Sequence, residues 1–214
     1  MSHAATAPTV RSATAEDVPG IARALGLAFW DDPLYRWLFP DTMTRRARTV
    51  RFHALFAGFA YVPDGTVDVV QEQVESPPHP VVRGAAWWDA PGHDAESRPS
   101  FLLRSLPHLA GLVGLSRLPA VSRYFARVGE ARPNEPHWYL AALGTDPVAQ
   151  GAGAGSALMR TGLERADADG LPVFLETMNP DNLPFYERHG FRVTKIMDET
   201  GTPTAYSMLR PAGS

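Results

Sequence analysis

Residues 145–159 read TDPVAQGAGAGSALM, and this stretch decides how the rest of the chain is interpreted. Its three glycines, Gly151, Gly153 and Gly155, alternate with alanines and are followed by a helical pattern. Glycine loses more backbone freedom on folding than any other residue, so a glycine-rich loop needs a physical reason. One reason is a loop whose amides surround an anion at the start of a helix. The alternative is a flexible turn, but three glycines in five residues are more than a turn requires.

The glycine-rich stretch lies between two segments with strand composition. HWYLAALGTD (137–146) precedes it, and PVFLET (172–177) follows a helical pattern that carries Leu158, Met159 and Leu163 on one face. Apolar residues spaced by three and four are typical of a helix, whereas a short apolar run bounded by turn residues is typical of a buried strand. The sequence therefore predicts a unit of strand, glycine loop, helix and strand.

The rest of the chain alternates between strand and helix patterns without an internal repeat. Thr14 and Asp17 have the spacing of a capping box, which predicts a helix with Ile21 and Leu25 on its apolar face. Further strands are expected at 9–14, 66–72, 81–90, 191–197 and 204–209, further helices at 31–41, 42–62 and 182–190, a turn at 76–80, and two or three inserted short helices at about 91–135. This order predicts a single mixed α/β domain over residues 1–214.

The composition narrows the class of protein. The 214 residues are 44% hydrophobic and 20% charged, as in a soluble protein with a substantial core. A net charge of -3 without a basic stripe disfavours a nucleic-acid partner. The chain has no cysteine, and its seven histidines lack the spacing of metal ligands, so we expect no metal. No signal peptide or membrane-spanning run is recognisable, which predicts a cytoplasmic enzyme or binding module without a membrane partner.

Two familiar phosphate-binding loops fit the glycine-rich stretch poorly. A Walker A loop needs a lysine before its Ser or Thr, and none lies near Ser156. A dinucleotide fingerprint has the spacing G-x-G-x-x-G, but the third glycine here comes one residue early. That fingerprint also needs an acidic residue about 20 positions on, at the end of the next strand. Glu176 is near that distance but lies inside VFLET.

A third pattern fits. Residues 150–155 read Q-x-x-G-x-G, follow a strand and open a helix. About 30 residues later, NPDNLPFYERHGFRV (179–193) has an asparagine, then a tyrosine in F-Y-E, then G-F opening a strand. The two motifs together resemble the Gcn5-related N-acetyltransferase (GNAT) superfamily, whose acetyl-CoA loop has the form [QR]-x-x-G-x-[GA].

The resemblance narrows further to puromycin N-acetyltransferase and its relatives. Residues 132–158 and 174–194 carry it, and residues 10–33 do so more loosely, whereas the inserted region at 91–135 matches only in position and length. Two positions depart from the pattern. Ala152 stands where relatives often have Lys or Arg, so pyrophosphate binding would depend on backbone amides. Asp32 stands where a tyrosine is expected, which leaves the acceptor open.

The resemblance implies a fold and a cofactor. The fold is a mostly antiparallel twisted sheet that splays at the acetyl-CoA site, with helices on both faces and the helical insertion before the fourth strand. Acetyl-CoA would bind to one set of residues: Leu143, Gly144, Thr145, Gln150, Gly151, Ala152, Gly153, Ala154, Gly155, Ser156 and Asn182. The amide near Leu143 would stabilise charge on the thioester carbonyl. Asn182 also suits an N-cap of the following helix.

Two side chains are the expected catalysts. Tyr186, the tyrosine of F-Y-E, would protonate the departing thiolate; the alternative is that its ring only packs. Glu176 would accept the proton of the acceptor amine; the alternative is a buried paired carboxylate. Asp31, Asp32 and Glu135 compete with Glu176 as the base.

The acceptor side is expected to include Phe29, Trp30, Asp32 and Trp88. The predicted reaction is acetyl transfer from acetyl-CoA to a primary amine of a small molecule, such as an amino-nucleoside or another antibiotic, by a monomer or homodimer. Two alternatives stay open. One is a non-catalytic module that binds acyl-CoA, and the other is transfer to a peptide or protein amine. The insertion at 91–135 favours a covered pocket over the open groove that a peptide needs.

Overall fold

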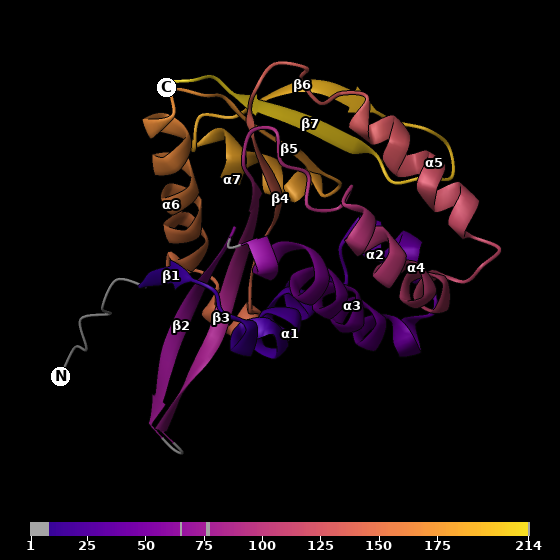
Figure 1. The fold of residues 1–214 in the computed structure, drawn as a ribbon, viewed down its shortest axis with the longest axis horizontal. Helices are drawn as coiled ribbons and strands as arrows, with labels where there is room; N and C mark the ends of the chain where they lie inside the picture. The colour runs from indigo at the N-terminus through magenta and orange to yellow at the C-terminus, as the bar shows by residue number, and fades with distance from the viewer. Residues whose placement is uncertain (1–8, 65, 76–77, 214) are drawn as a thin grey trace.

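The structure is a computed structural model that describes residues 9–64, 66–75 and 78–213. One seven-stranded sheet runs through the molecule in the order β1-β2-β3-β4-β5-β7-β6 (Figure 1). All neighbouring strands are antiparallel except β4 and β5. The strands are β1 (Val10–Ser12), β2 (Val67–Glu75), β3 (Pro78–Asp89), β4 (Trp138–Thr145), β5 (Val173–Thr177), β6 (Arg192–Met197) and β7 (Ala205–Arg210). The mixed, mostly antiparallel sheet predicted from the resemblance is confirmed.

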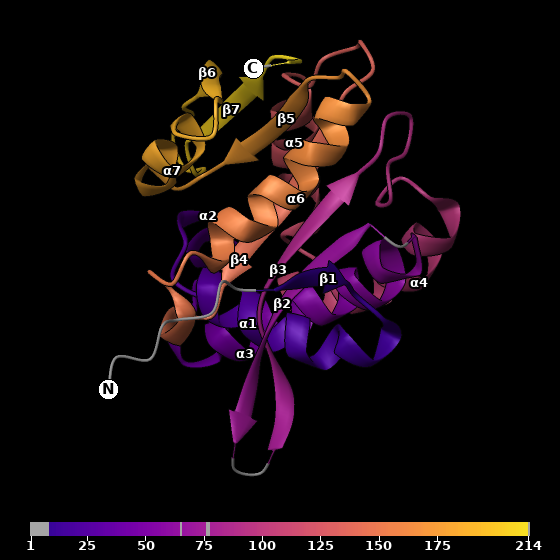
Figure 2. The same ribbon diagram turned by 90° about the vertical axis from the view of Figure 1, so that its left-hand side faces the viewer.

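Helices cover both faces of this sheet (Figures 1 and 2). The helices are α1 (Val18–Phe29), α2 (Pro33–Leu38), α3 (Thr42–Phe56), α4 (Pro99–Val113), α5 (Leu118–Gly129), α6 (Ala154–Ala168) and α7 (Leu183–Glu187), with a π-helical turn, η2 (Ala57–Tyr61), after α3. Alternation along β2 separates two cores. Val69 packs in the core under α1 and α3, and Val70 packs in the core under α6.

Local sequence signals explain where the first helices begin. The Thr14 amide donates to the Asp17 carboxylate at 2.8 Å, as expected for the capping box. Asp32 caps α2 by accepting from the Leu34 amide at 2.9 Å, and Pro33 occupies the first turn. Such caps satisfy amides that have no partner inside the helix.

Several predicted boundaries differ from the structure. The insertion contains two helices, within the two or three expected, but α4 runs through Pro107 as far as Val113 and is capped by Gly114, which has a φ of 93°. A proline inside a helix costs a backbone hydrogen bond, and here it lies in a surface helix whose Leu103 is 80% exposed. Strand β3 already begins at Pro78, inside the segment predicted as a turn (76–80). Residues 76–77 lie outside the described part of the chain.

The strands β4 and β5 separate where the resemblance predicts a splay. Their ladder pairs residues 138–140 with 173–175 and ends at Leu140 and Leu175. Strand β4 nevertheless continues to Thr145, held on its other edge by β3 through the pair Gly84 and Thr145. The second half of β4 therefore presents an open edge toward the glycine loop and α7.

Candidate active site

A cleft of about 550 Å³ opens at the free end of β4. Three segments distant in the sequence line it, one at the end of α1 and the start of α2, one at the end of β4 and the glycine loop, and one around α7. The lining residues are Ala28, Phe29, Asp31, Asp32, Pro33, Arg36, Leu143, Gly144, Thr145, Gln150, Gly155, Asn179, Asp181, Asn182, Phe185 and Tyr186. Its volume is in the range typical of small-molecule sites.

The glycine loop has the backbone that its sequence suggested. Gly151 and Gly153 have φ angles of 80° and 83°, which L-residues with a side chain rarely adopt. Gly153 is the N-cap of α6, and the first helical hydrogen bond joins the Ala157 amide to its carbonyl at 2.9 Å. The preceding amides of α6 therefore have no partner within the helix and carry its positive dipole end.

Gly155 and Gly144 lie on the cleft for different reasons. A Cβ at Gly155 would lie 3.6 Å from the Phe185 ring and 3.8 Å from the Thr145 methyl, so it would enter the cleft without a clash. A Cβ at Gly144 would approach Leu25 and Phe29 to 2.9 Å, because α1 packs directly on this part of β4. Gly144 is thus required by packing, a reason that the motif alone did not reveal.

Tyr186 lies in the wall of the cleft and is 7% exposed. Its ring packs edge-on against Phe185 at 5.4 Å and near Phe191 at 6.0 Å. Burial, followed by the nearby Asp32 carboxylate, raises the pKa of Tyr186 above its ordinary value. The phenol therefore stays protonated at neutral pH, and packing does not exclude a chemical role.

Asn182 occupies the N-cap position of α7, but its side chain makes no capping hydrogen bond. Its Nδ2 instead donates to Thr177 Oγ1 at 3.5 Å. The adjacent 3-10 turn is capped by Asn179, whose Oδ1 accepts from the Asp181 amide at 3.1 Å. The side-chain capping role considered for Asn182 is therefore not found, and the residue lines the cleft.

The acidic residues that compete for the base role have different surroundings. Hydrogen bonds from Arg36 hold the pKa of Asp31 below its usual range, and the pair is 2.6 Å apart. Burial raises the pKa of Asp32 to about 6, against the opposing effect of the Leu34 amide. Asp32 is thus the weaker acid of the two and is better suited to accept a proton near neutral pH. Glu135 lines a second cavity of about 550 Å³, which includes residues from the other end of β4.

Glu176 lies on β5 just beyond the last pair with β4, and it is not among the residues that line the cleft. Burial raises the pKa of Glu176 to about 7, while the Arg132 charge and a hydrogen bond from Tyr139 oppose the rise. Arg132 lies 3.9 Å above the Tyr139 ring. The Glu176 Oε2 atom is buried and has no hydrogen-bond partner among the described residues. Neither Arg132 nor Tyr139 belongs to a motif, so the sequence did not single them out.

The predicted acceptor residues are only partly brought together. Phe29 and Asp32 line the cleft, whereas Trp30 is 40% exposed and lies outside its lining. Trp88 is fully buried in the core under α6, where a Cβ at Gly162 would lie 2.0 Å from its ring. This position leaves Trp88 no surface for a substrate, and we do not retain it as a substrate-binding residue.

The chemistry of the site suits a thioester with a pyrophosphate. The first amides of α6 offer a position for an anion. The free edge of β4 offers backbone groups to an extended amide chain. Residues of both elements line the same cleft. Among the described residues, no group of three or more His, Cys, Asp or Glu side chains is placed to hold a metal ion. None of the described helices is long and apolar enough to cross a lipid bilayer.

Comparison with known proteins agrees with this chemistry. Residues 67–191 match the family described as Acetyltransferase (GNAT) family. An uncharacterised N-acetyltransferase of Schizosaccharomyces pombe is 27% identical over 186 residues, which cover 83% of this chain and 71% of that protein.

Solved structures extend the comparison to the whole chain. A Corynebacterium glutamicum protein, described as histone acetyltransferase HPA2 and related acetyltransferase, is 28% identical with a TM-score of 0.68 over 98% of both chains. A mosquito arylalkylamine N-acetyltransferase like 5b shares the fold at 13% identity, with a TM-score of 0.60 over 95% of this chain and 99% of that one. The family match covers more than half of the chain and includes the glycine loop and Tyr186. This chain therefore belongs to the GNAT family and is an acetyl-CoA-dependent N-acetyltransferase.

Proposed function

We propose that the acceptor is a primary amine of a small molecule, acetylated by direct attack on the thioester. The observation that carries the proposal is the shared cleft, in which Asp32, the N-cap of α2, and Tyr186 from α7 flank the open end of β4. An amine is mostly an ammonium ion at neutral pH. Asp32 is a carboxylate that can hold this cation, and Phe29 beside it offers an apolar ring surface.

The proposed chemistry assigns one step to each side chain. Bound acetyl-CoA supplies the acetyl group as an activated thioester. Glu176 accepts the proton that the ammonium must lose, since a base with a pKa of about 7 is matched to neutral conditions. The amide near Leu143 donates to the thioester oxygen as negative charge develops. Tyr186, protonated throughout the neutral range, gives its proton to the departing thiolate. The attacking nitrogen loses its second proton as the amide forms, and this proton restores the Tyr186 phenol.

Contacts of the β6–β7 loop favour a small acceptor over a peptide. This loop is bonded across to the insertion and to α2: the Tyr124 hydroxyl donates to the Pro203 carbonyl at 3.2 Å, and the Trp37 indole donates to the Gly201 carbonyl at 3.0 Å. An extended peptide needs an open groove with free backbone partners. Because these hydrogen bonds hold the β6–β7 loop against α2 and α5, less room is left for such a groove.

The narrower acceptor class is an amino-nucleoside or a related antibiotic, which would make the enzyme a resistance factor. The resemblance of residues 132–158 and 174–194 to puromycin N-acetyltransferase supports it, together with the aromatic wall at Phe29. Asp32, in place of the expected tyrosine, predicts a preference for a more cationic acceptor. The reaction needs only one chain, as a monomer or within a homodimer.

The experiment that tests the proposal measures free thiol release from acetyl-CoA with a panel of amines. The panel includes an amino-nucleoside, an arylalkylamine, a polyamine and a peptide with a free N-terminus. Turnover with at least one of the small amines, exceeding that with the peptide, is the expected result. Tight CoA binding without turnover on any amine would support the rival function, a non-catalytic acyl-CoA-binding module.

A further inference from the structure

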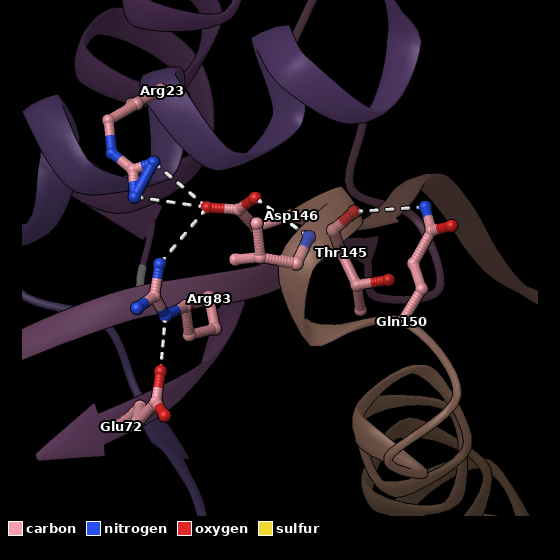
Figure 3. A network of polar contacts seen from close by, with 7 residues as sticks. Arg23, Glu72, Arg83, Thr145, Asp146 and Gln150 are labelled. Carbon is pink, nitrogen blue, oxygen red and sulfur yellow. Dashed lines mark hydrogen bonds and ion pairs between the residues drawn. The ribbon is translucent and has the colours of Figure 1, made fainter.

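An ion-pair network lies where β4 ends and the glycine loop begins (Figure 3). At its centre is Asp146, the residue between the end of β4 and the loop, whose side chain is 3% exposed. Arg23 from α1 donates to Asp146 Oδ2 from both terminal nitrogens, at 2.9 and 3.0 Å. Arg83 from β3 reaches the same oxygen at 3.3 Å. Two elements distant in the sequence are thus tied to one carboxylate.

The remaining polar atoms of Asp146 are also fixed. Its Oδ1 accepts from the Val148 amide at 3.2 Å, and its own amide donates to the Arg83 carbonyl at 2.7 Å. Arg83 is oriented in turn by Glu72 on β2, at 2.6 Å. The side chain and the backbone of Asp146 are therefore both held, and the direction in which the chain leaves β4 is set by this residue.

The groups that Asp146 supports are those of the cofactor site. Thr145 directly precedes it and lines the cleft, and the Gln150 side chain closes the corner by donating to the Thr145 carbonyl at 3.4 Å (Figure 3). Gly151 and Gly153 follow, with φ angles of 80° and 83°. Hydrogen bonds to a bound anion require donors placed to within about half an ångström.

Arg23 gives this support a link to the acceptor side. It lies on α1, whose last turn carries Ala28 and Phe29 into the cleft. The same turn packs against Gly144 on β4. The Arg23–Asp146 ion pair therefore connects the helix that carries Ala28 and Phe29 to the residue at which the loop begins.

We infer that Asp146, gripped by Arg23 and Arg83, is a positioning residue that sets the glycine loop for the pyrophosphate of CoA. The site lacks a basic side chain at Ala152, so pyrophosphate binding depends on amide placement, and amide placement depends on this network. The inference concerns CoA binding alone and does not depend on which amine is acetylated.

The test compares CoA, which contains the pyrophosphate, with pantetheine, which does not. CoA affinity is measured by calorimetry and pantetheine affinity by NMR titration, for Arg23→Gln, Arg23→Lys and Asp146→Asn. Arg23→Gln should weaken CoA binding about tenfold, which corresponds to the loss of one strong charge-assisted contact. Pantetheine affinity should stay unchanged. Arg23→Lys should recover part of the loss, because it keeps the charge but not the paired geometry.

The control is Arg127→Gln, which removes another arginine from an exposed ion pair, with Glu199, far from the loop in sequence. It should leave both affinities unchanged. Unaltered CoA affinity in Arg23→Gln would overturn the inference, and so would equal losses for CoA and pantetheine, since general damage does not distinguish the two ligands. Should Asp146→Asn fail to fold, the two Arg23 variants test the inference, because the Arg23 side chain is 44% exposed and its substitution disturbs the core little.

Discussion

Gly155→Val is the sharpest perturbation of the glycine loop. Gly155 lies in the first turn of α6 with helical backbone, so a side chain there causes no backbone strain. Its Cβ would have ordinary contacts, 3.6 Å to Phe185 and 3.8 Å to Thr145. The two methyl groups of valine then extend beyond this Cβ, at the cleft in which we propose that the cofactor binds.

The magnitude follows from the space that remains. Forcing extra methyl groups into a filled site costs about 1–3 kcal/mol, so CoA affinity should fall roughly 5- to 140-fold. The melting temperature should stay equal or rise slightly, because glycine is less favourable than other residues inside a helix by up to about 1 kcal/mol. Gly153→Val is unsuitable for this purpose, since its φ of 83° strains any side chain.

The assay is calorimetric CoA titration beside a thermal melt, with Gly111→Val as the matched control. Gly111 is also helical, in α4, and a Cβ there meets no atom within 4 Å. The control should keep wild-type affinity. Wild-type CoA affinity in Gly155→Val would refute the reasoning, because the residue would then not face the bound cofactor.

Three further predictions follow from the same geometry. Tyr186→Phe should lower kcat by about 10²- to 10⁴-fold and leave CoA affinity unchanged. An equal loss of kcat and of CoA affinity would contradict the role of Tyr186 as the general acid. Wild-type kcat should rise as pH increases through about 7, where Glu176 ionises. Arg132→Gln should move this rise in kcat to higher pH, because the Arg132 charge lowers the pKa of Glu176. An unchanged pH dependence in the variant would contradict the assignment of Glu176 as the base. A raised folded-state pKa means that Glu176 stabilises the fold below its unfolded pKa and that this contribution is lost as pH rises through about 7. Glu176→Gln should therefore raise the melting temperature at pH 8, with a gain in the free energy of unfolding of at most about 3 kcal/mol. A lower melting temperature of the variant at pH 8 would contradict this prediction.

Much of the fold was predictable because its signals are local. The capping box of Thr14 and Asp17 defines a helix start within a few positions, and the strand composition of HWYLAALGTD is unambiguous. The glycine spacing and the F-Y-E motif identified two of the three segments that meet at the cleft. These signals need no knowledge of distant contacts.

The rest depends on contacts between distant residues. Trp87 and Trp88 are adjacent, yet a register shift in the pairing of β3 with β4 lies between them, and they belong to separate cores. Composition alone does not say which of them could reach a ligand. The partners of Asp146 are 63 and 123 residues away in the sequence, so no local motif predicts this network.

We propose that this acetyltransferase modifies a small primary amine. The most direct test is mass spectrometry of the amine panel after incubation with acetyl-CoA and the wild-type enzyme, with Tyr186→Phe run in parallel. The account predicts a single added acetyl group on a small amine, a much slower gain with Tyr186→Phe, and little or no modification of the peptide. Acetylation of the peptide in preference to every small amine would contradict it.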